Sequence, residues 1–117
     1  MLSPAPNTRI FVAIEPFDMR GAQRSLAGAV RRLGLDPTDG HLYVFLAKRR
    51  NIAKILFFDR SGWVVYMKRL ELGTFQLPLT TGASQVRVDA TTLHQLLDGV
   101  DLSAPRRRWY RADPASR

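Results

Sequence analysis

The sequence predicts an α+β fold with a mainly antiparallel sheet of four to five strands, one long N-terminal helix and one short C-terminal helix. Three β-rich runs follow one another with short connections, which is typical of a central three-strand meander. Segments with helical spacing of apolar residues lie before and after these runs. The length of 117 residues and a hydrophobic content of 45% fit one domain with one ordinary core.

The first expected elements are a buried strand and a long helix. Residues 9–14 are short, β-branched and aromatic, as a buried strand should be. Asp18 is suited to cap the N-terminus of a helix, and Gly34 is suited to the left-handed position that ends one. Apolar residues recur between them at helical spacing, which predicts about four turns. These residues are Met19, Ala22, Leu26, Ala29, Val30 and Leu33.

A dense turn at residues 36–40, Asp-Pro-Thr-Asp-Gly, separates this helix from the meander. The three strands of the meander are expected at residues 41–47, 52–59 and 63–69. Both faces of these strands carry apolar side chains, whereas a sheet with one wet face would alternate with polar residues. Something must therefore cover each face. With only two expected helices, a partner subunit is one candidate, and homo-oligomer formation is left open.

After Pro78 the chain leaves the meander. Residues 85–88 predict one more short strand, and residues 91–98 predict a helix that ends before Gly99. The composition then shifts to a basic segment without periodicity. The expected organisation is an N-terminal lead at 1–8, a single α+β domain at 9–103 and a basic, flexible tail at 104–117.

Composition indicates an anionic partner. The 18 Lys and Arg residues outnumber the 10 Asp and Glu residues and give a formal net charge of +8, which favours polyanions such as DNA. A simpler alternative is that the charge only maintains solubility. The chain has no cysteine, no apolar stretch long enough to span a membrane and no basic-then-apolar start, so we expect a cytoplasmic protein without membrane contact.

The meander predicts a cluster of basic residues at one edge. Alternate strand ends meet in a meander, so the first hairpin tip should lie near the end of the third strand. Like charges repel at such an edge unless solvent screens them or an anion such as phosphate neutralises them. The residues expected there are Lys48, Arg49, Arg50, Lys54, Lys68 and Arg69.

Two further basic groups are candidates for nucleic-acid contact. Arg20, Arg24 and Arg31 should share the outer face of the long helix, although a solvated helix face is the simpler interpretation. In the tail, arginines flank Trp109 and Tyr110, whose rings are able to stack on exposed bases. The alternative is that this aromatic pair docks on the domain. The tail arginines are Arg106, Arg107, Arg108 and Arg111.

The sequence offers little support for an enzyme. His41 and His94 are isolated and lack a metal-ligand spacing, and no phosphate-binding glycine loop, nucleophile elbow or dinucleotide fingerprint is present. We therefore expect no catalytic residue, no metal and no cofactor. A cryptic metal-dependent nuclease would need converging carboxylates. Asp59 and Glu71 are candidates for that role, and mutation of either should then abolish cleavage.

Three motifs in order resemble one family over roughly residues 9–103. Their sequences are Asp-Met-Arg at 18–20, Asp-Pro at 36–37 followed by Gly-His-Leu-Tyr-Val-Phe at 40–45, and Lys-Arg-Leu-Glu at 68–71 leading to Gly73, Phe75 and Pro78. Together they are similar to the TnpB-type accessory protein of insertion sequence sixty-six elements, encoded by the second reading frame. The sequence departs from that pattern at Gly21-Ala22-Gln23, at Leu72 and at Leu77. The first departure weakens the prediction of a DNA contact on the helix.

The resemblance implies a non-catalytic accessory protein of DNA transposition that assists a separate transposase. Combined with the charge pattern, it predicts binding to the nucleic-acid backbone without reading of bases. The alternative is a protein-interaction module that binds the transposase, or itself, through the apolar sheet and has little affinity for DNA.

Overall fold

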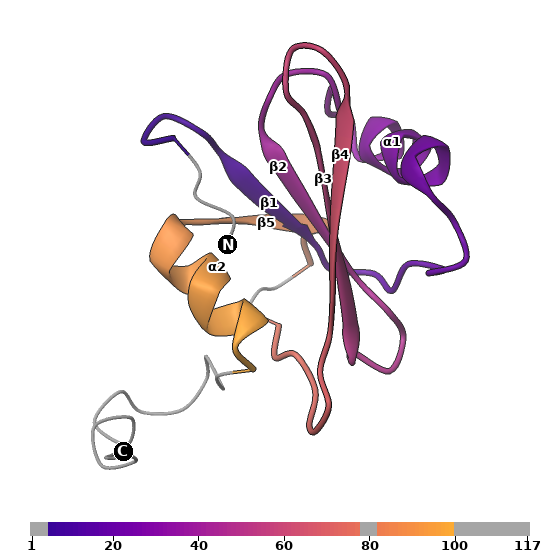
Figure 1. Ribbon diagram of the computed structural model, residues 1–117, viewed down its shortest axis with the longest axis vertical. Helices are drawn as coiled ribbons and strands as arrows, with labels where there is room; N and C mark the ends of the chain where they lie inside the picture. The colour runs from indigo at the N-terminus through magenta and orange to yellow at the C-terminus, as the bar shows by residue number, and fades with distance from the viewer. Residues whose placement is uncertain (1–4, 78–81, 100–117) are drawn as a thin grey trace.

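The computed structural model describes residues 5–77 and 82–99 of the chain. Five strands form one sheet, and a helix packs on each side of it (Figure 1). In chain order the elements are β1 (Ile10–Ala13), α1 (Gln23–Arg32), β2 (Leu42–Leu46), β3 (Ile52–Phe58), β4 (Trp63–Arg69), β5 (Gln85–Val88) and α2 (Ala90–Leu97).

The sheet is mixed, so the expected mainly antiparallel sheet is wrong. Its order is β4-β3-β2-β1-β5, and β1 runs parallel to β2 with Ile10 beside Leu42. The other neighbours are antiparallel. The parallel pair arises because α1 carries the chain across one face between β1 and β2, which is the connection that parallel neighbours require.

The expected long N-terminal helix is also wrong, because α1 has only 10 residues. Asp18 does not cap it: the N-cap is Ala22, which makes no side-chain capping bond. Asp18 instead closes a turn in which its carbonyl oxygen accepts a hydrogen bond from the Gly21 amide at 3.2 Å. Its carboxylate accepts one from the Arg20 amide at 3.0 Å. Aspartate competes for nearby backbone amides in this way, so the turn replaces the first predicted turn of helix.

Other sequence predictions are confirmed. The three-strand meander is β2-β3-β4, and the short strand and helix at the C-terminal end of the domain are β5 and α2. Gly34 has a φ of 81°, the left-handed conformation expected just after a helix. In the 36–40 turn, Asp36 accepts hydrogen bonds from the Thr38 amide and hydroxyl at 2.9 and 2.7 Å. The hydrogen bond from the Thr38 amide lowers the pKa of Asp36, and the hydrogen bond from the Thr38 hydroxyl lowers it further.

The two apolar faces of the sheet are covered by the chain itself. On one face, Leu26 and Val30 of α1 pack with Tyr43, Phe45 and Leu56 of the sheet, all buried. We call this the α1 face. On the other, the α2 face, helix α2 lies against the sheet (Figure 1). Its leucines and the side chain of Phe75 pack there with the buried residues of the strands. A partner subunit is therefore not needed to cover the central strand β2 on either face. No helix in the described part of the chain is long and apolar enough to cross a membrane.

Leu26 tests whether α1 stabilises the fold by covering its face of the sheet. Its side chain is 0% exposed, so Leu26→Ala should lower the free energy of unfolding by about 2–5 kcal/mol through lost burial and the cavity that remains. Chemical denaturation followed by circular dichroism measures this. The matched control is Leu72→Ala, whose side chain is 89% exposed and whose effect should stay within about 0.5 kcal/mol. Equal effects in the two variants would contradict the packing.

Candidate nucleic-acid interface

The turn between β2 and β3 presents three consecutive cations, at residues 48–50. The amide of Ala47 donates to the Ile52 carbonyl at 3.0 Å, and the amide of Arg50 donates to the Ala47 carbonyl at 2.8 Å. Arg50 completes this tight turn with a φ of 57°, which is uncommon for a residue with a side chain. The side chains of Lys48, Arg49 and Arg50 are exposed.

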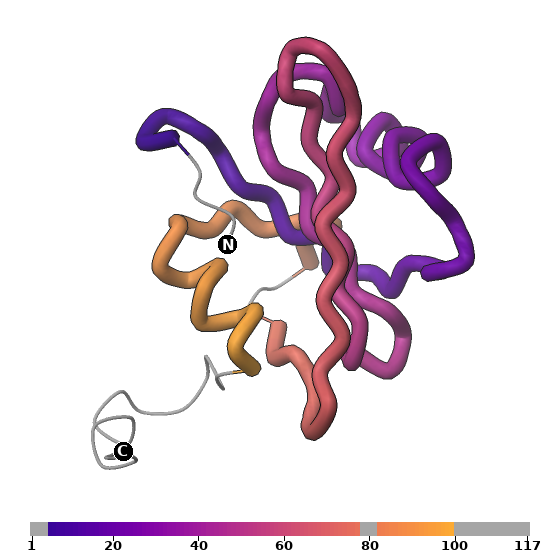
Figure 2. The backbone as a smooth tube through the Cα atoms, in the orientation of Figure 1, coloured from indigo at the N-terminus to yellow at the C-terminus, as the bar shows by residue number. Residues whose placement is uncertain are grey.

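The segment after β4 holds this turn in place. The amide of Leu70 donates to the Asn51 carbonyl at 2.9 Å, and the amide of Phe75 donates to the Arg50 carbonyl at 2.6 Å. The Phe75 side chain is fully buried on the α2 face, so it anchors the segment that makes the second bond. Figure 2 shows the β2–β3 turn and the loop after β4 at the same end of the sheet. We call this end of the sheet, which carries Lys48, Arg49 and Arg50, the basic end. The backbone that carries its cations is therefore preorganised.

Three predicted cations meet at a hollow on the α1 face of the basic end. Lys48, Arg49 and Arg69 line it together with the 17–19 segment, and its volume is about 380 Å³. Arg69 reaches this place because it pairs with Ile52 across β3 and β4, next to the turn. The expected proximity of the hairpin tip and the end of the third strand is thus observed for these residues.

Lys54 does not take part in this exposed group. Its Nζ donates hydrogen bonds to the carbonyl oxygens of Met19 and Gly21, both at 2.9 Å, and its side chain is half-buried. The ammonium group therefore ties the turn before α1 to the sheet. Two of its three N–H donors are used within the fold, so Lys54 is less available to phosphate than the exposed cations.

Lys68 lies on the opposite face from Arg69. Successive side chains of a strand point to opposite faces, so these neighbours cannot share one surface. The Nζ of Lys68 lies 3.8 Å from a carboxylate oxygen of Asp98, just after α2. The predicted cluster is therefore divided. Lys48, Arg49 and Arg69 gather at one hollow, whereas Arg50, Lys54 and Lys68 do not line it.

The predicted arginine ridge of α1 is altered because Arg20 precedes the helix. Its guanidinium pairs with the carboxylate of Asp18 at 2.7 Å. The side-chain hydrogen bond from Arg20, followed by the bond from the Arg20 amide, lowers the pKa of Asp18 to about 2. Arg24 lies on α1 and lines a second hollow of about 360 Å³ with Arg32. Phe17 and Asp18 line both hollows, so the two are contiguous.

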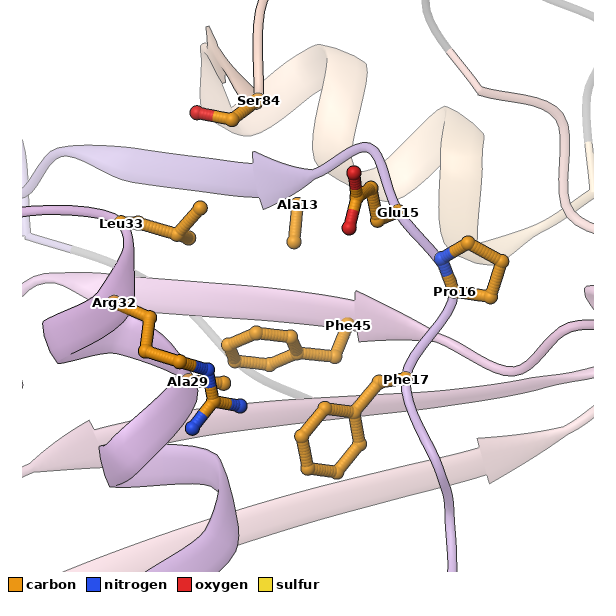
Figure 3. Close-up of a pocket in the computed structure, with 9 residues that line it drawn as sticks. All are labelled: Ala13, Glu15, Pro16, Phe17, Ala29, Arg32, Leu33, Phe45 and Ser84. Carbon is orange, nitrogen blue, oxygen red and sulfur yellow. The ribbon is translucent and has the colours of Figure 1, made fainter.

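A third hollow, also about 360 Å³, adjoins these two through Phe17 and Arg32 (Figure 3). The rings of Phe17 and Phe45 have their centroids 5.1 Å apart and form its apolar part. Arg32 lies beside these rings and Glu15 lies at another side of the hollow. Sequence reasoning did not single out Arg32. Its position in the last turn of α1 gave no signal that it would lie beside Phe17, which comes from a separate segment.

The groups considered for catalysis have structural contacts. His41 accepts a hydrogen bond at Nδ1 from the Arg9 amide at 2.9 Å, which joins β2 to β1. The Asp59 carboxylate accepts one from the Gly62 amide at 3.2 Å in the β3–β4 turn. Within residues 5–77 and 82–99, no three His, Cys, Asp or Glu side chains gather closely enough to hold a metal ion.

The arginines of the tail, residues 104–117, lie outside the described residues.

The fold and this surface define a small basic protein with a mixed five-stranded sheet and a cationic end. The sequence matches the family described as IS66 Orf2 like protein over residues 8–107, and the chain belongs to that family. Proteins of this family are accessory proteins of IS66 insertion elements, and the family is not a known catalytic one.

Two relatives from Sinorhizobium fredii are similar along nearly the whole chain. Uncharacterized protein y4hO is 34% identical over 110 residues, which cover 93% of this chain and 95% of the relative. Uncharacterized protein y4jC is 33% identical over 110 residues, which cover 92% of each. No solved structure matches the chain. The predicted resemblance to the accessory protein of insertion sequence sixty-six elements is thus confirmed.

The pairing of Asp18 with Arg20 makes a testable prediction about pH. Because the folded pKa lies near 2, below the ordinary 3.8, the pair stabilises the fold above about pH 4 and loses that contribution as the pH falls through about 2. In Arg20→Gln the pKa of Asp18 should rise toward its ordinary value, with the bond from the backbone amide limiting the rise. Carboxyl-carbon NMR titration measures both pKa values.

Asp36 is the internal control for this titration, because Thr38 is the main cause of its lowered pKa and Arg20 is not among the causes. Its titration should be the same in wild type and in Arg20→Gln. A wild-type Asp18 that titrates at its ordinary value would contradict the pairing.

Proposed function

We propose that this protein is a non-catalytic accessory factor of DNA transposition that binds the nucleic-acid backbone through its basic end. The observation that carries the proposal is the convergence of Lys48, Arg49 and Arg69 on one hollow, presented by a turn that two backbone hydrogen bonds hold in place. The family supplies the context of transposition. The contact with DNA and the partnership with a transposase are our inference.

The chemistry of these side chains favours phosphate. Arginine presents a planar set of donors that matches phosphate oxygens, and lysine adds a compact positive charge. Three exposed cations near one hollow repel one another in the free protein, and a bound phosphate relieves that repulsion. Release of counterions from DNA then adds a favourable, salt-dependent term to binding.

The contiguous hollows extend this surface along the α1 face. From the basic end it continues past Phe17 and Asp18 to Arg24 and Arg32. Asp18 does not add an isolated negative charge, because Arg20 neutralises it in the exposed pair. We infer that a DNA backbone lies along these hollows and contacts cations from the β2–β3 turn, from β4 and from α1. No group in this account reads a base.

The competing function is an interaction module for the transposase. Binding through the covered parts of the sheet would require α1 or α2 to move, and among the described residues of the sheet the exposed large apolar side chains are those of Val65 and Met67 on β4. The hollow in Figure 3 favours a different route, since its aromatic floor and its Arg32 suit an apolar side chain next to an acidic one. Binding of this kind would respond only weakly to salt, whereas backbone binding to DNA would respond strongly.

Charge-matched variants test the proposal. Lys48→Gln, Arg49→Gln and Arg69→Gln combined remove the cations of the hollow and lower the formal net charge of +8 by three. We expect affinity for random duplex DNA at low salt to fall by at least about tenfold. The slope of log K against log salt should become shallower by about 2.7, which corresponds to roughly 0.9 for each lost phosphate contact. Fluorescence anisotropy at several salt concentrations measures both quantities.

The matched control removes the same charge elsewhere. Arg9→Gln, Arg60→Gln and Arg87→Gln combined act on exposed residues before β1, of the β3–β4 turn and of β5. This variant should keep most of the wild-type affinity and a slope close to that of the wild type. Equal losses in the two variants would show that net charge alone attracts DNA, and absence of binding by the wild type at low salt would overturn the proposal.

A further inference from the structure

Strand β4 is an edge of the sheet that carries exposed apolar side chains. Among the described residues, its only neighbour in the sheet is β3. Val65 is 38% exposed and Met67 is 53% exposed, both large fractions for apolar side chains. They pair across the sheet with Leu56 and Lys54, so both project on the α1 face. An exposed edge with apolar residues is a surface to which another strand is able to add.

The hydrogen bonds at the two ends of β4 determine which of its residues face outward. The Asp59 amide donates to the Gly62 carbonyl at 3.0 Å, and the Leu70 amide donates to the Asn51 carbonyl at 2.9 Å. Backbone groups of an antiparallel strand alternate between its two neighbours, so the even-numbered residues from 62 to 70 face β3. The odd-numbered residues direct their amides and carbonyls to the open side. They are Trp63, Val65, Met67 and Arg69.

We propose that two copies of this chain associate through antiparallel pairing of their β4 strands about a two-fold axis at Tyr66. In this register Val65 of one copy lies opposite Met67 of the second copy, and Trp63 lies opposite Arg69. All four outward residues of each strand then have a hydrogen-bonding partner. A shift of two residues in either direction leaves one strand end unpaired, so the register is unique in this respect.

The side chains are complementary in the same register. The exposed apolar residues of both copies gather into one patch on the α1 face, which removes them from water. Arg69 approaches the ring of Trp63 in the other copy, and the face of an aromatic ring attracts a cation. Lys68 lies opposite Val64, so no two like charges of the paired strands face each other. The β3–β4 turn, in which Asp59 offsets the charge of Arg60, lies near the basic end of the other copy. Parallel pairing of the same two edges would instead turn the α1 faces of the two copies to opposite sides of the joined sheet, so their exposed apolar residues would not share one patch.

Pairing at β4 joins the two sheets into one and keeps both α1 faces on the same side, because a two-fold axis perpendicular to a sheet preserves its faces. The two basic ends lie at opposite ends of the paired strands. The pairing does not depend on the proposed DNA contact, and it can therefore be tested without DNA.

Sedimentation equilibrium over a range of concentrations tests the pairing. The wild type should form dimers, and Met67→Lys should raise the dimer dissociation constant at least about tenfold, because edge lysines oppose strand addition. Leu72→Lys is the matched control: it makes the same kind of change at a residue that is 89% exposed and lies outside β4, and it should dimerise as the wild type does. A monomeric wild type, or a Met67→Lys dimer of unchanged strength, would overturn the proposal.

Cysteine cross-linking tests the register independently of any loss of stability. The chain has no cysteine, so introduced thiols are the only ones present. A Val65→Cys and Met67→Cys double variant places thiols directly opposite each other at a Cα separation of about 5.5 Å, which a disulfide can span. We expect covalent dimers on mild oxidation. Leu72→Cys should give few, and equal cross-linking of the two variants would refute the register.

Discussion

The constraint on which this structure depends is that β2 is buried on both faces. All five of its residues are buried, so each face of the sheet needs a cover. The crossover helix α1 supplies one cover and makes β1 parallel to β2, while α2 and Phe75 supply the other. The same packing arranges the candidate interface. Buried Phe75 holds the segment whose amide fixes the Arg50 carbonyl, and the β2–β3 turn thereby keeps its cations exposed at one end of the sheet.

Much of the fold could be predicted because its signals are local. The runs that form β3 and β4 are rich in β-branched and aromatic residues, and the 36–40 turn contains proline, aspartate and glycine. The parallel pairing of β1 was missed because the choice of a strand's neighbour depends on contacts between distant segments, which no local pattern records. The length of α1 was missed because Asp18 suits both a helix cap and a turn. The chain forms the turn that ends at Gly21 in place of a helix cap, and Lys54, 33 residues later, donates a hydrogen bond to the Gly21 carbonyl.

The candidate site was predictable in part because a meander brings alternate strand ends together. The meander alone places Arg69 beside the β2–β3 turn, and the register confirms that position. Strand alternation also separates Lys68 from Arg69, a consequence that an argument from proximity along the chain overlooks. The direction of the Lys54 side chain depends on the backbone before α1, so the sequence could not reveal it. Arg32 was missed because it meets the interface only through the packing of Phe17.

The central claim is that DNA meets this protein at the basic end and along the adjoining hollows of the α1 face. Amide NMR spectra recorded while a short duplex is added at low salt test it most directly, because each backbone amide reports on its own surroundings. We expect the largest shifts at Lys48, Arg49 and Arg69, with smaller ones at Arg24 and Arg32, and reversal when salt is added. Shifts confined to β5 and α2, or no shifts at low salt, would contradict the account.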